Sequence, residues 1–205
     1  MTHTSNWIKR GIKRSADFTV SLLLICMFAP LIVAVAFAIR IRLGSPVIFV
    51  QIRPGLNGVP FSIFKFRTMS NECDANGILL PDDRRISKLG DFLRSTSIDE
   101  IPQLVNVLMG QMSLVGPRPL LMEYLPLYTD RQKIRLKVKP GITGYAQVNG
   151  RNARDWASRL DLDSWYVENW SLLLDVKILI ATVGVVFFRR GIKQPGRATV
   201  DKFKG

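Results

Sequence analysis

The strongest hydrophobic signal in the chain is a stretch of 22 residues without a charge, from Phe18 to Ile39. A straight helix of that size would be about 33 Å long and could cross a bilayer. Pro30 lies near its middle, however, where a proline breaks or kinks a helix. Each half would reach only about halfway through the hydrocarbon. The pattern therefore predicts a helix–break–helix at Ala29 and Pro30, which enters one leaflet and returns to the cytoplasmic side.

Basic residues flank this stretch at both ends. They are Lys9, Arg10, Lys13 and Arg14 before it, and Arg40 and Arg42 after it. The positive-inside rule therefore favours neither end outside. A single straight span is the main alternative, and a buried hairpin of a soluble protein is the weakest. A cleaved signal peptide would fit the basic start and residues 34–36, but the apolar stretch continues past them directly into Arg40.

Two β-rich segments follow, Val47–Ile52 and Phe61–Phe66, with a turn-rich connector at residues 53–58. This pattern predicts an antiparallel hairpin. Lys65 and Arg67 are two residues apart, so they share one face of the second strand. A solvated face and a functional cationic face explain these two residues equally well.

The middle of the chain alternates short helical segments with turns. Residues 71–85 contain turn formers and mixed charges, which predict a surface loop. Residues 86–94 have apolar positions on one face and predict a short amphipathic helix. Residues 101–109 predict a helix that ends at Gly110, and residues 112–115 predict a brief strand.

Two adjacent carboxylates, Asp99 and Glu100, lie between these two helices. Ser97 and Glu100 match a capping box, and carboxylates suit the positive end of a helix dipole. Pro102 comes too late for a first-turn proline, because it would remove a backbone donor and crowd the carbonyl of Ile98. Strain beside paired carboxylates indicates a candidate functional site.

Arginines near this pair suit phosphate binding. Arg94 ends the amphipathic helix before the pair, and Arg118 lies between Pro117 and Pro119. The two prolines restrict the backbone around Arg118, which favours a guanidinium that meets a phosphate in fixed geometry.

Three later segments carry weaker signals. Residues 131–139 have a basic residue at every odd position, for which plain solvation is slightly favoured over contact with lipid headgroups. Residues 140–152 contain three glycines among amides and predict a loop that can hold a nucleotide, although the spacing matches neither a P-loop nor a dinucleotide fingerprint. The apolar tail at 172–188 contains Asp175 and Lys177 and predicts a core or interfacial helix.

Composition narrows the chemistry. The chain has 205 residues and a formal charge of +13, so its partner is expected to be anionic: nucleic acid, an anionic membrane surface or phosphorylated small molecules. It has one histidine, His3, and two cysteines, Cys26 and Cys73. These counts argue against histidine triads, zinc sites and a disulfide framework. Catalysis would therefore rest on carboxylates, lysine and arginine, with a hard metal ion as an option.

Four segments in order resemble the bacterial sugar transferases, also called monotopic polyprenyl-phosphate phosphoglycosyl transferases. They are FKFRTM at 64–69, LRSTSIDEIPQL at 93–104, MSLVGPRP at 112–119 and PGITGYAQVNGRN at 140–152. The resemblance covers nearly the whole chain. Its length resembles the small members, which lack an extra multi-helix N-terminal domain. Family members commonly have Ser-Pro at the membrane-helix break, whereas this chain has Ala29-Pro30, so no hydroxyl supports the break.

The resemblance implies transfer of a sugar-1-phosphate from a UDP-sugar to a polyprenyl (undecaprenyl) phosphate, with release of UMP. It implies that Asp99 is the nucleophile and forms a covalent phosphosugar intermediate, and that Glu100 helps to hold Mg²⁺. A cation is chemically reasonable, because a carboxylate that attacks a diphosphate faces like-charge repulsion. The expected substrate-binding residues are Arg94, Arg118, Lys65, Arg67, Gly144, Gln147, Asn149 and Arg151.

The expected fold is α+β, mostly helical with a small antiparallel β element, plus a re-entrant membrane helix and interfacial amphipathic helices. Residues 1–42 would form the membrane part and residues 43–205 a catalytic domain on the cytoplasmic face of the bacterial inner membrane. Expected partners are the UDP-sugar, the polyprenyl phosphate and an anionic phospholipid membrane, with downstream glycosyltransferases or a second copy as options and no nucleic acid.

Two other classes of protein compete with this expectation. A basic nucleic-acid-binding protein would be soluble and salt-sensitive, but the long apolar run and the lack of a recognition motif argue against it. A non-catalytic membrane scaffold would not need Asp99.

Overall fold

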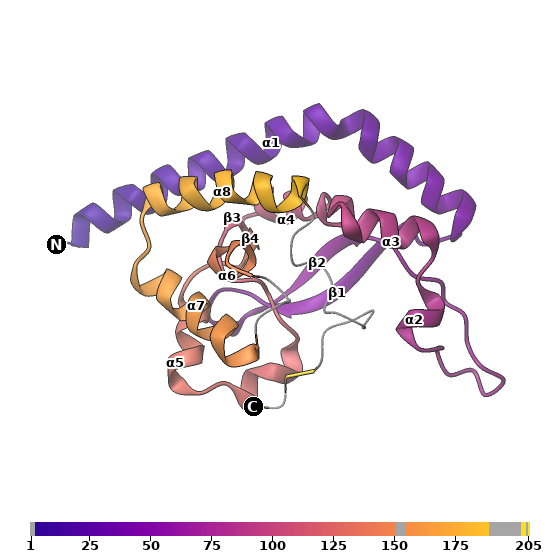
Figure 1. Ribbon diagram of the computed structural model, residues 1–205. Coiled ribbons are helices and arrows are strands. Elements are labelled where there is room, and N and C mark those ends of the chain that lie inside the picture. The colour runs from indigo at the N-terminus through magenta and orange to yellow at the C-terminus, as the bar shows by residue number, and fades with distance from the viewer. Residues whose placement is uncertain (1–2, 151–154, 189–201, 204) are drawn as a thin grey trace.

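The longest element is the helix α1 (His3–Arg42), which contains Pro30. The structure, a computed structural model, describes residues 3–150, 155–188, 202–203 and 205. Figure 1 shows α1 as one continuous helix that bends along its length over the rest of the molecule. Pro30 is the expected cause of the bend, because it removes a backbone donor and crowds the preceding turn. The predicted break is therefore a bend within one helix.

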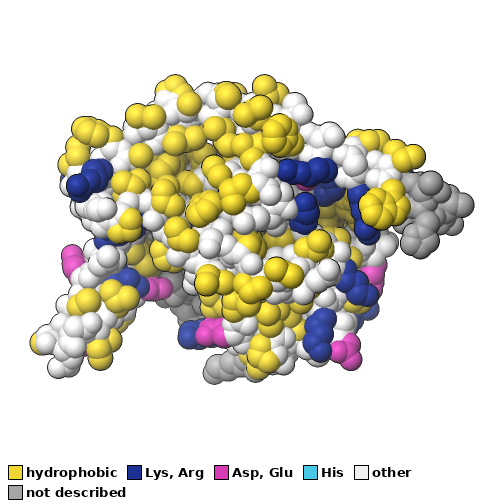
Figure 2. Space-filling view, turned by 180° about the vertical axis from the view of Figure 1, so that it is seen from behind, with side chains coloured by type: hydrophobic (Ala, Val, Ile, Leu, Met, Phe, Trp, Pro, Cys, Tyr) yellow, Lys and Arg dark blue, Asp and Glu magenta, His cyan; other side chains and the backbone are white. Residues whose placement is uncertain are grey.

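Among the described residues, α1 is the one helix long and apolar enough to cross a membrane, between Trp7 and Arg42. Only 11% of its most apolar window is buried, whereas a helix in a soluble core would be mostly buried. The helix α8 (Leu172–Phe187) lies beside α1 and also exposes large apolar side chains. Figure 2 shows hydrophobic side chains gathered over a broad part of one face. These features are compatible with membrane association.

The first β element is an antiparallel hairpin of β1 (Ile48–Pro54) and β2 (Pro60–Phe66), as predicted. Ile48 pairs with Phe66 at one end of the ladder, and Pro54 pairs with Pro60 at the other. The connector holds a short 3₁₀ turn, η1 (Leu56–Gly58), in which Asn57 has a φ of 56° and Gly58 a φ of 78°. Asn and Gly tolerate this left-handed backbone better than other residues.

The second β element is a parallel pair of β3 (Ser113–Val115) and β4 (Gly141–Thr143). The sequence predicts β3 but not β4. Between them lie η3 (Met122–Leu127), α5 (Asp130–Lys133) and η4 (Ile134–Lys137). A side chain at Gly116, just after β3, would place its Cβ 2.4 Å from the carbonyl oxygen of Lys139. Glycine is therefore needed for the two segments to approach each other.

The other helices are short except for one. They are α2 (Asp82–Arg85), α3 (Lys88–Ser95), η2 (Ile98–Glu100), α4 (Gln103–Leu108), α6 (Tyr145–Val148) and α7 (Trp156–Glu168). The helices predicted at 86–94 and 101–109 are confirmed as α3, which begins two residues later and ends one residue later, and α4, which is shorter at both ends. The mostly helical α+β fold is confirmed as well. The segment expected to be an open loop at 140–152 instead contains β4 and α6.

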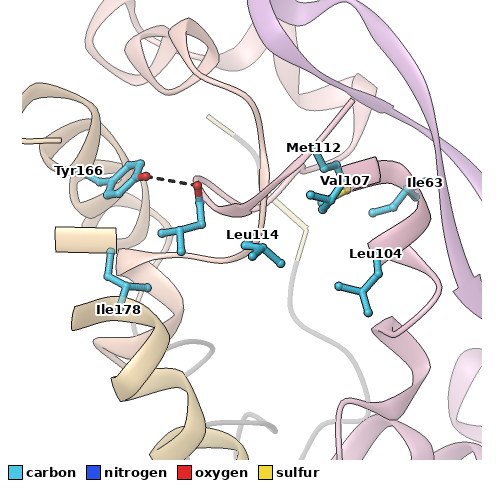
Figure 3. Close-up of a cluster of buried hydrophobic side chains, with 8 residues drawn as sticks. Ile63, Leu104, Val107, Met112, Leu114, Tyr166 and Ile178 are labelled. Carbon is cyan, nitrogen blue, oxygen red and sulfur yellow. Dashed lines mark hydrogen bonds between the residues drawn. The ribbon is translucent and has the colours of Figure 1, made fainter. Parts of the chain in front are cut away.

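The main core joins β2, α4, β3, α7 and α8, and Figure 3 shows its side chains. Its buried members are Ile63, Leu104, Val107, Met112, Leu114, Val115, Tyr166 and Ile178. The hydroxyl of Tyr166 donates a hydrogen bond of 3.3 Å to the carbonyl of Val115, which satisfies a polar group that burial would otherwise penalise. The core thus fixes β3, and with it the chain that leads to Arg118.

The first half of α1 is fastened to this core by charged side chains. Lys13 pairs with Asp175 of α8 at 2.6 Å, and Asp17 accepts a hydrogen bond from the backbone of Leu114 at 3.1 Å. Arg14 donates to the carbonyls of Val107 and Leu108 at the end of α4 (2.6 and 2.7 Å), where unpaired helix carbonyls attract a cation.

The second half of α1 contacts the same domain at a different place. Ile39 is fully buried, and Val35 is nearly so. Both pack in a cluster with Phe66 of β2 and Leu93 of α3. The two halves of the bent helix are therefore held against one body of protein.

The basic residues of segment 131–139 were predicted to be solvated, and the structure differs from this prediction at one residue. Arg135 of η4 is 3% exposed and forms a buried ion pair with Asp163 at 2.8 Å. The prediction that these basic residues are solvated is therefore wrong for Arg135. The segment is neither a strand nor a regular helix, because α5 is followed directly by the 3₁₀ turn η4, so simple periodicity does not place its side chains. Arg131 is exposed and pairs with Asp161 at the surface.

Candidate active site

The two adjacent carboxylates lie on η2, a tight turn between α3 and α4. The capping box predicted for Ser97 and Glu100 is wrong: Ser97 has a left-handed backbone (φ 58°) and its side chain makes no capping bond. Pro102 is the N-cap of α4, where its missing backbone donor costs the helix no hydrogen bond. The strained residue is Ser97 itself, since a non-glycine residue at positive φ is uncommon.

Glu100 is held by two cations from distant parts of the chain. Lys65 of β2 approaches its Oε1 at 2.8 Å. Arg118 donates to Oε1 at 2.5 Å and to Oε2 at 3.3 Å, a two-pronged contact that suits a guanidinium. Glu100 is 8% exposed. Burial would raise the pKa of Glu100, but Arg118 and Lys65 outweigh burial and hold that pKa well below its usual range. Glu100 is therefore ionised at neutral pH.

Asp99 has the opposite environment. It is as buried as Glu100, and the described residues give its carboxylate no hydrogen bond or ion pair. Burial, followed by the charge of Glu100, raises the pKa of Asp99 to about 6. Adjacent carboxylates with divergent pKa values are typical of catalytic sites. Asp99 is thus a largely ionised carboxylate at neutral pH, and its oxygens have no partner among the described residues.

Both carboxylates border a cavity of about 660 Å³. Its lining contains eight basic and five acidic residues, so an anionic ligand is favoured. Of the substrate-binding residues expected from the sequence, Lys65, Arg67, Arg94, Arg118 and Gln147 line this cavity. A cavity of this size is within the usual range for small-molecule sites.

Two of these basic residues have structural contacts. Arg67 is buried and donates to the carbonyls of Met69 and Ser45, both at 2.9 Å, so it shapes the wall of the cavity. Arg94 donates to the hydroxyl of Thr68 at 3.0 Å, a neutral partner that leaves its charge available to an anion.

The residues of segment 140–152 that were expected to bind substrate have different positions in the structure. Gln147 of α6 donates to the carbonyl of Ile142 at 3.0 Å, while its Oε1 is buried without a partner in the described residues. Gly144 is where the chain passes close to Gly116, since a Cβ there would lie 2.2 Å from its carbonyl oxygen. Asn149 donates to the carbonyl of Tyr145, away from the cavity lining. Arg151 lies outside the described residues.

Sequence reasoning missed several residues of the lining. Arg53, Trp156, Arg159 and the Arg135–Asp163 pair all border the cavity. Arg53 lies at the start of the turn connector, where a charged residue is common and gives no functional signal. The three residues of α7, Trp156, Arg159 and Asp163, lie 103 or more positions from Arg53 along the chain, so no local pattern connects them to it.

A second, apolar pocket of about 300 Å³ lies between α1, α4, α6 and α8. Its walls include Leu24, Phe28 and Leu31 of α1 and Val185 of α8. It shares Ser97, Glu100 and Gln147 with the polar cavity. Glu100 thus lies where a polar cavity meets an apolar pocket under the bent helix, while its neighbour Asp99 borders the polar cavity.

The donor set is compatible with a magnesium ion. Mg²⁺ is usually bound by one or two carboxylates together with substrate phosphates. Oε2 of Glu100 accepts only one long contact, and the carboxylate of Asp99 accepts none from the described residues. No group of three or more metal-binding side chains is found within the described part of the chain. A metal here would therefore depend on substrate oxygens for part of its shell.

Comparison with known proteins places these features in a family. The family model for bacterial sugar transferases matches residues 8–189. The chain is 53% identical over 194 residues to the uncharacterized sugar transferase EpsL of Bacillus subtilis, which covers 95% of this chain and 96% of that protein.

Longer relatives are similar over part of their length. An undecaprenyl-phosphate galactose phosphotransferase of Salmonella typhimurium is 40% identical over 89% of this chain and 42% of its own length. A UDP-glucose:undecaprenyl-phosphate glucose-1-phosphate transferase of Escherichia coli is 38% identical over 86% of this chain and 40% of its own length. The chain therefore spans about two fifths of the length of these relatives. By the family match and by these identities, it belongs to the bacterial sugar transferase family.

Proposed function

We propose that this protein transfers a sugar-1-phosphate from a UDP-sugar to a polyprenyl phosphate at a membrane surface. The observation that carries the proposal is the carboxylate of Asp99, which is buried, has no partner among the described residues and borders a cavity lined by cations. Its neighbour Glu100 borders both this cavity and the apolar pocket. The names of the Salmonella and Escherichia coli relatives describe transfer to undecaprenyl phosphate, which supports the same general reaction for this chain.

The first step would form a covalent intermediate. A carboxylate oxygen of Asp99 attacks the sugar-bearing phosphorus of the donor, forming a new P–O bond. The bond from that phosphorus to the bridging oxygen breaks, and the electron pair leaves with UMP. No proton has to move in this step, which fits a site without a histidine among its lining residues.

The second step would regenerate the enzyme. An oxygen of the polyprenyl phosphate attacks the same phosphorus, and the bond to Asp99 breaks with its electron pair returning to the carboxylate. The product is a polyprenyl diphosphate sugar. Arg118 and Lys65 hold Glu100 ionised and fixed throughout, and Arg94 supplies a further positive charge to the phosphates.

Glu100 and Asp99 are the residues that would hold a magnesium ion. When bound, the ion would screen the negative phosphates and stabilise charge on the departing oxygen. The protein's own part is to present Oε2 of Glu100 while Arg118 and Lys65 keep its orientation.

We propose that α1 is a re-entrant helix rather than a span. Lys13 in its first half and Ile39 in its second half both contact the same domain. A helix whose two ends lay on opposite sides of a bilayer could not keep both contacts. The exposed apolar middle of the bend would then enter one leaflet, with the domain at the cytoplasmic face of the bacterial inner membrane.

The apolar pocket would receive the first isoprene units of the acceptor. Its walls come from α1 and α8, which would face lipid, and its inner end is bordered by Glu100. A lipid phosphate that enters from the membrane would thereby reach the carboxylate pair while its chain stays in apolar surroundings.

The proposal is tested by assaying purified protein in detergent with Mg²⁺, undecaprenyl phosphate and a panel of UDP-sugars. We expect UMP release with at least one donor, and loss of at least 10³-fold in rate for Asp99→Asn, which keeps size but removes the nucleophile. Glu100→Gln should abolish activity or weaken its magnesium dependence. Asp161→Asn, at an exposed ion pair, is the matched control and should retain wild-type rate.

Intact-mass measurement gives a second readout. Without acceptor, the wild-type protein mixed with a productive donor should gain the mass of one sugar phosphate, and Asp99→Asn should gain none. Full turnover by Asp99→Asn would overturn the assignment of the nucleophile. Absence of UMP release with every donor would favour the non-catalytic scaffold.

A further inference from the structure

Arg53 is a cation of the polar cavity that forms no ion pair with a carboxylate of the described residues. It lies near the end of β1, and its guanidinium donates to the amide oxygen of Gln51 (2.6 and 3.1 Å) and to the carbonyl of Pro119 (3.3 Å). All of these acceptors are uncharged. Burial, then the neighbouring Arg118, lowers the pKa of Arg53 to about 10, which leaves it fully charged at neutral pH.

Arg159 of α7 is a second cation of the cavity; the charge of Asp163 also acts on it, but Asp163 is ion-paired with Arg135. Its guanidinium lies 4.3 Å above the ring of Trp156, whose own position is fixed by edge contact with Tyr124. The described residues give Arg159 no hydrogen-bond acceptor and no ion pair. Stacking on an aromatic ring orients a guanidinium while leaving its edge donors open.

Two other arginines of the cavity are already paired with carboxylates. Arg118 is paired with Glu100, and Arg135 is paired with Asp163. Arg118 lowers the pKa of both Arg53 and Arg159, so the three guanidinium groups are near enough to repel one another. Concentrated positive charge in a hollow is costly unless an anion occupies it.

The position of the two arginines indicates which anionic ligand they would contact. The apolar pocket meets the cavity at Ser97, Glu100 and Gln147, and neither Arg53 nor Arg159 borders that pocket. In Figure 1, α7 lies on the side of the molecule away from α1. A lipid-linked phosphate would enter beside Glu100, so Arg53 and Arg159 face a ligand that comes from water.

We propose that Arg53 and Arg159 bind the uridine-linked phosphate of the donor and retain it as UMP departs. This inference rests on the proposed function and assigns these two residues a leaving-group site. When Asp99 bonds to the sugar-bearing phosphorus, the electron pair of the broken P–O bond stays on the uridine-linked phosphate. The charge on that phosphate rises from about −1 to −2, so nearby cations stabilise the transition state more than the bound donor.

The experiment compares binding of UMP and of uridine to Arg53→Gln, Arg159→Gln and wild-type protein in detergent. Charge-assisted hydrogen bonds to a phosphate predict a loss of about 10- to 100-fold in UMP affinity for each variant. Uridine, which lacks the phosphate, should bind all three proteins within twofold. The KM for undecaprenyl phosphate should stay within twofold of wild type.

Two further variants sharpen the result. Arg159→Lys keeps the charge but loses the planar fork and the stacking, so it should recover part of the lost affinity. Arg131→Gln removes an exposed arginine of α5, outside the cavity lining, and should change neither ligand's affinity. Thermal unfolding of each variant shows whether it is folded, and Arg53→Gln carries the test if Arg159→Gln is not.

Unchanged UMP affinity in folded variants would overturn the inference, as would an equal loss of uridine affinity. A selective rise in the KM for undecaprenyl phosphate would overturn it too, because the cations would then serve the acceptor. Failure of the proposed function looks different: the wild-type protein itself would neither release UMP from any UDP-sugar nor bind UMP.

Discussion

Arg118 donates hydrogen bonds to both carboxylate oxygens of Glu100, at 2.5 and 3.3 Å, although the two residues are 18 positions apart in the chain. The carbonyl of Arg118 in turn accepts a 2.6 Å hydrogen bond from Arg135, whose charge is balanced by buried Asp163. The arginine is thus fixed at its side chain and at its backbone. This double fixation leaves Glu100 with a defined orientation beside the open carboxylate of Asp99.

The first prediction concerns the shape of this contact. Arg118→Lys keeps the positive charge but cannot bond both oxygens at once, so Glu100 would turn more freely. We expect kcat to fall about 10- to 100-fold, with a smaller change in the KM for the donor. Steady-state UMP release measures both constants. An unchanged kcat would show that charge alone is sufficient at this position.

The second prediction concerns the protonation of Asp99 in the metal-free protein. Burial and the charge of Glu100 raise its pKa to about 6, so the ionised fraction should fall as pH drops through 6. Carbon NMR of labelled carboxylates, in the presence of a chelator, should show one aspartate titrating near that pH. Asp99→Asn identifies the signal by removing it. A midpoint near 4, the ordinary value, would contradict the environment described here.

Much of this arrangement could be predicted from local sequence. The β1–β2 hairpin, the helices α3 and α4 and the membrane-compatible α1 all follow from periodicity and turn residues. The pair Asp99–Glu100 stands out in the sequence because two carboxylates lie near an unusual proline. The local reason differs in the structure, because the residue with a positive φ is Ser97 and Pro102 is the N-cap of α4.

What sequence could not supply were contacts between distant segments. Nothing local indicates that Lys65 would meet Glu100, or that Arg135 would be buried against Asp163. The parallel partner of β3 was missed because three-residue strands carry too few positions to show alternation. Arg53 and Arg159 gain their significance only from the fold, which brings two solitary arginines to one cavity.

The third prediction concerns the fastening of α1. Asp175 receives Lys13 at 2.6 Å, the hydroxyl of Tyr166 at 2.7 Å and the indole of Trp170 at 3.1 Å. Asp175→Ala would leave all three donors without this acceptor, one of them charged. We expect the free energy of unfolding to fall by about 2–4 kcal/mol, seen as a lower Tm in detergent.

The control for this fastening is an aspartate at the surface. Asp161→Ala removes a carboxylate whose pair with Arg131 is exposed on both sides, so its Tm should change little. Equal Tm values for the two variants would mean that the link between α1 and α8 contributes nothing to stability. A large loss confined to Asp175→Ala would show that the buried carboxylate that receives Lys13 of α1 stabilises the protein.

The last prediction concerns the path of α1 through the membrane. Single cysteines at Ser5 and Ser45 flank the helix core, in a background with Cys26 and Cys73 replaced by serine. Because both halves of α1 contact one domain, we expect both cysteines to react with an impermeant maleimide from the cytoplasmic side alone. Inverted and right-side-out vesicles distinguish the sides, and detergent permeabilisation shows that each cysteine can react. Labelling of the two positions from opposite sides would establish a span, and it would require the contact of either Lys13 or Ile39 to be broken in the membrane.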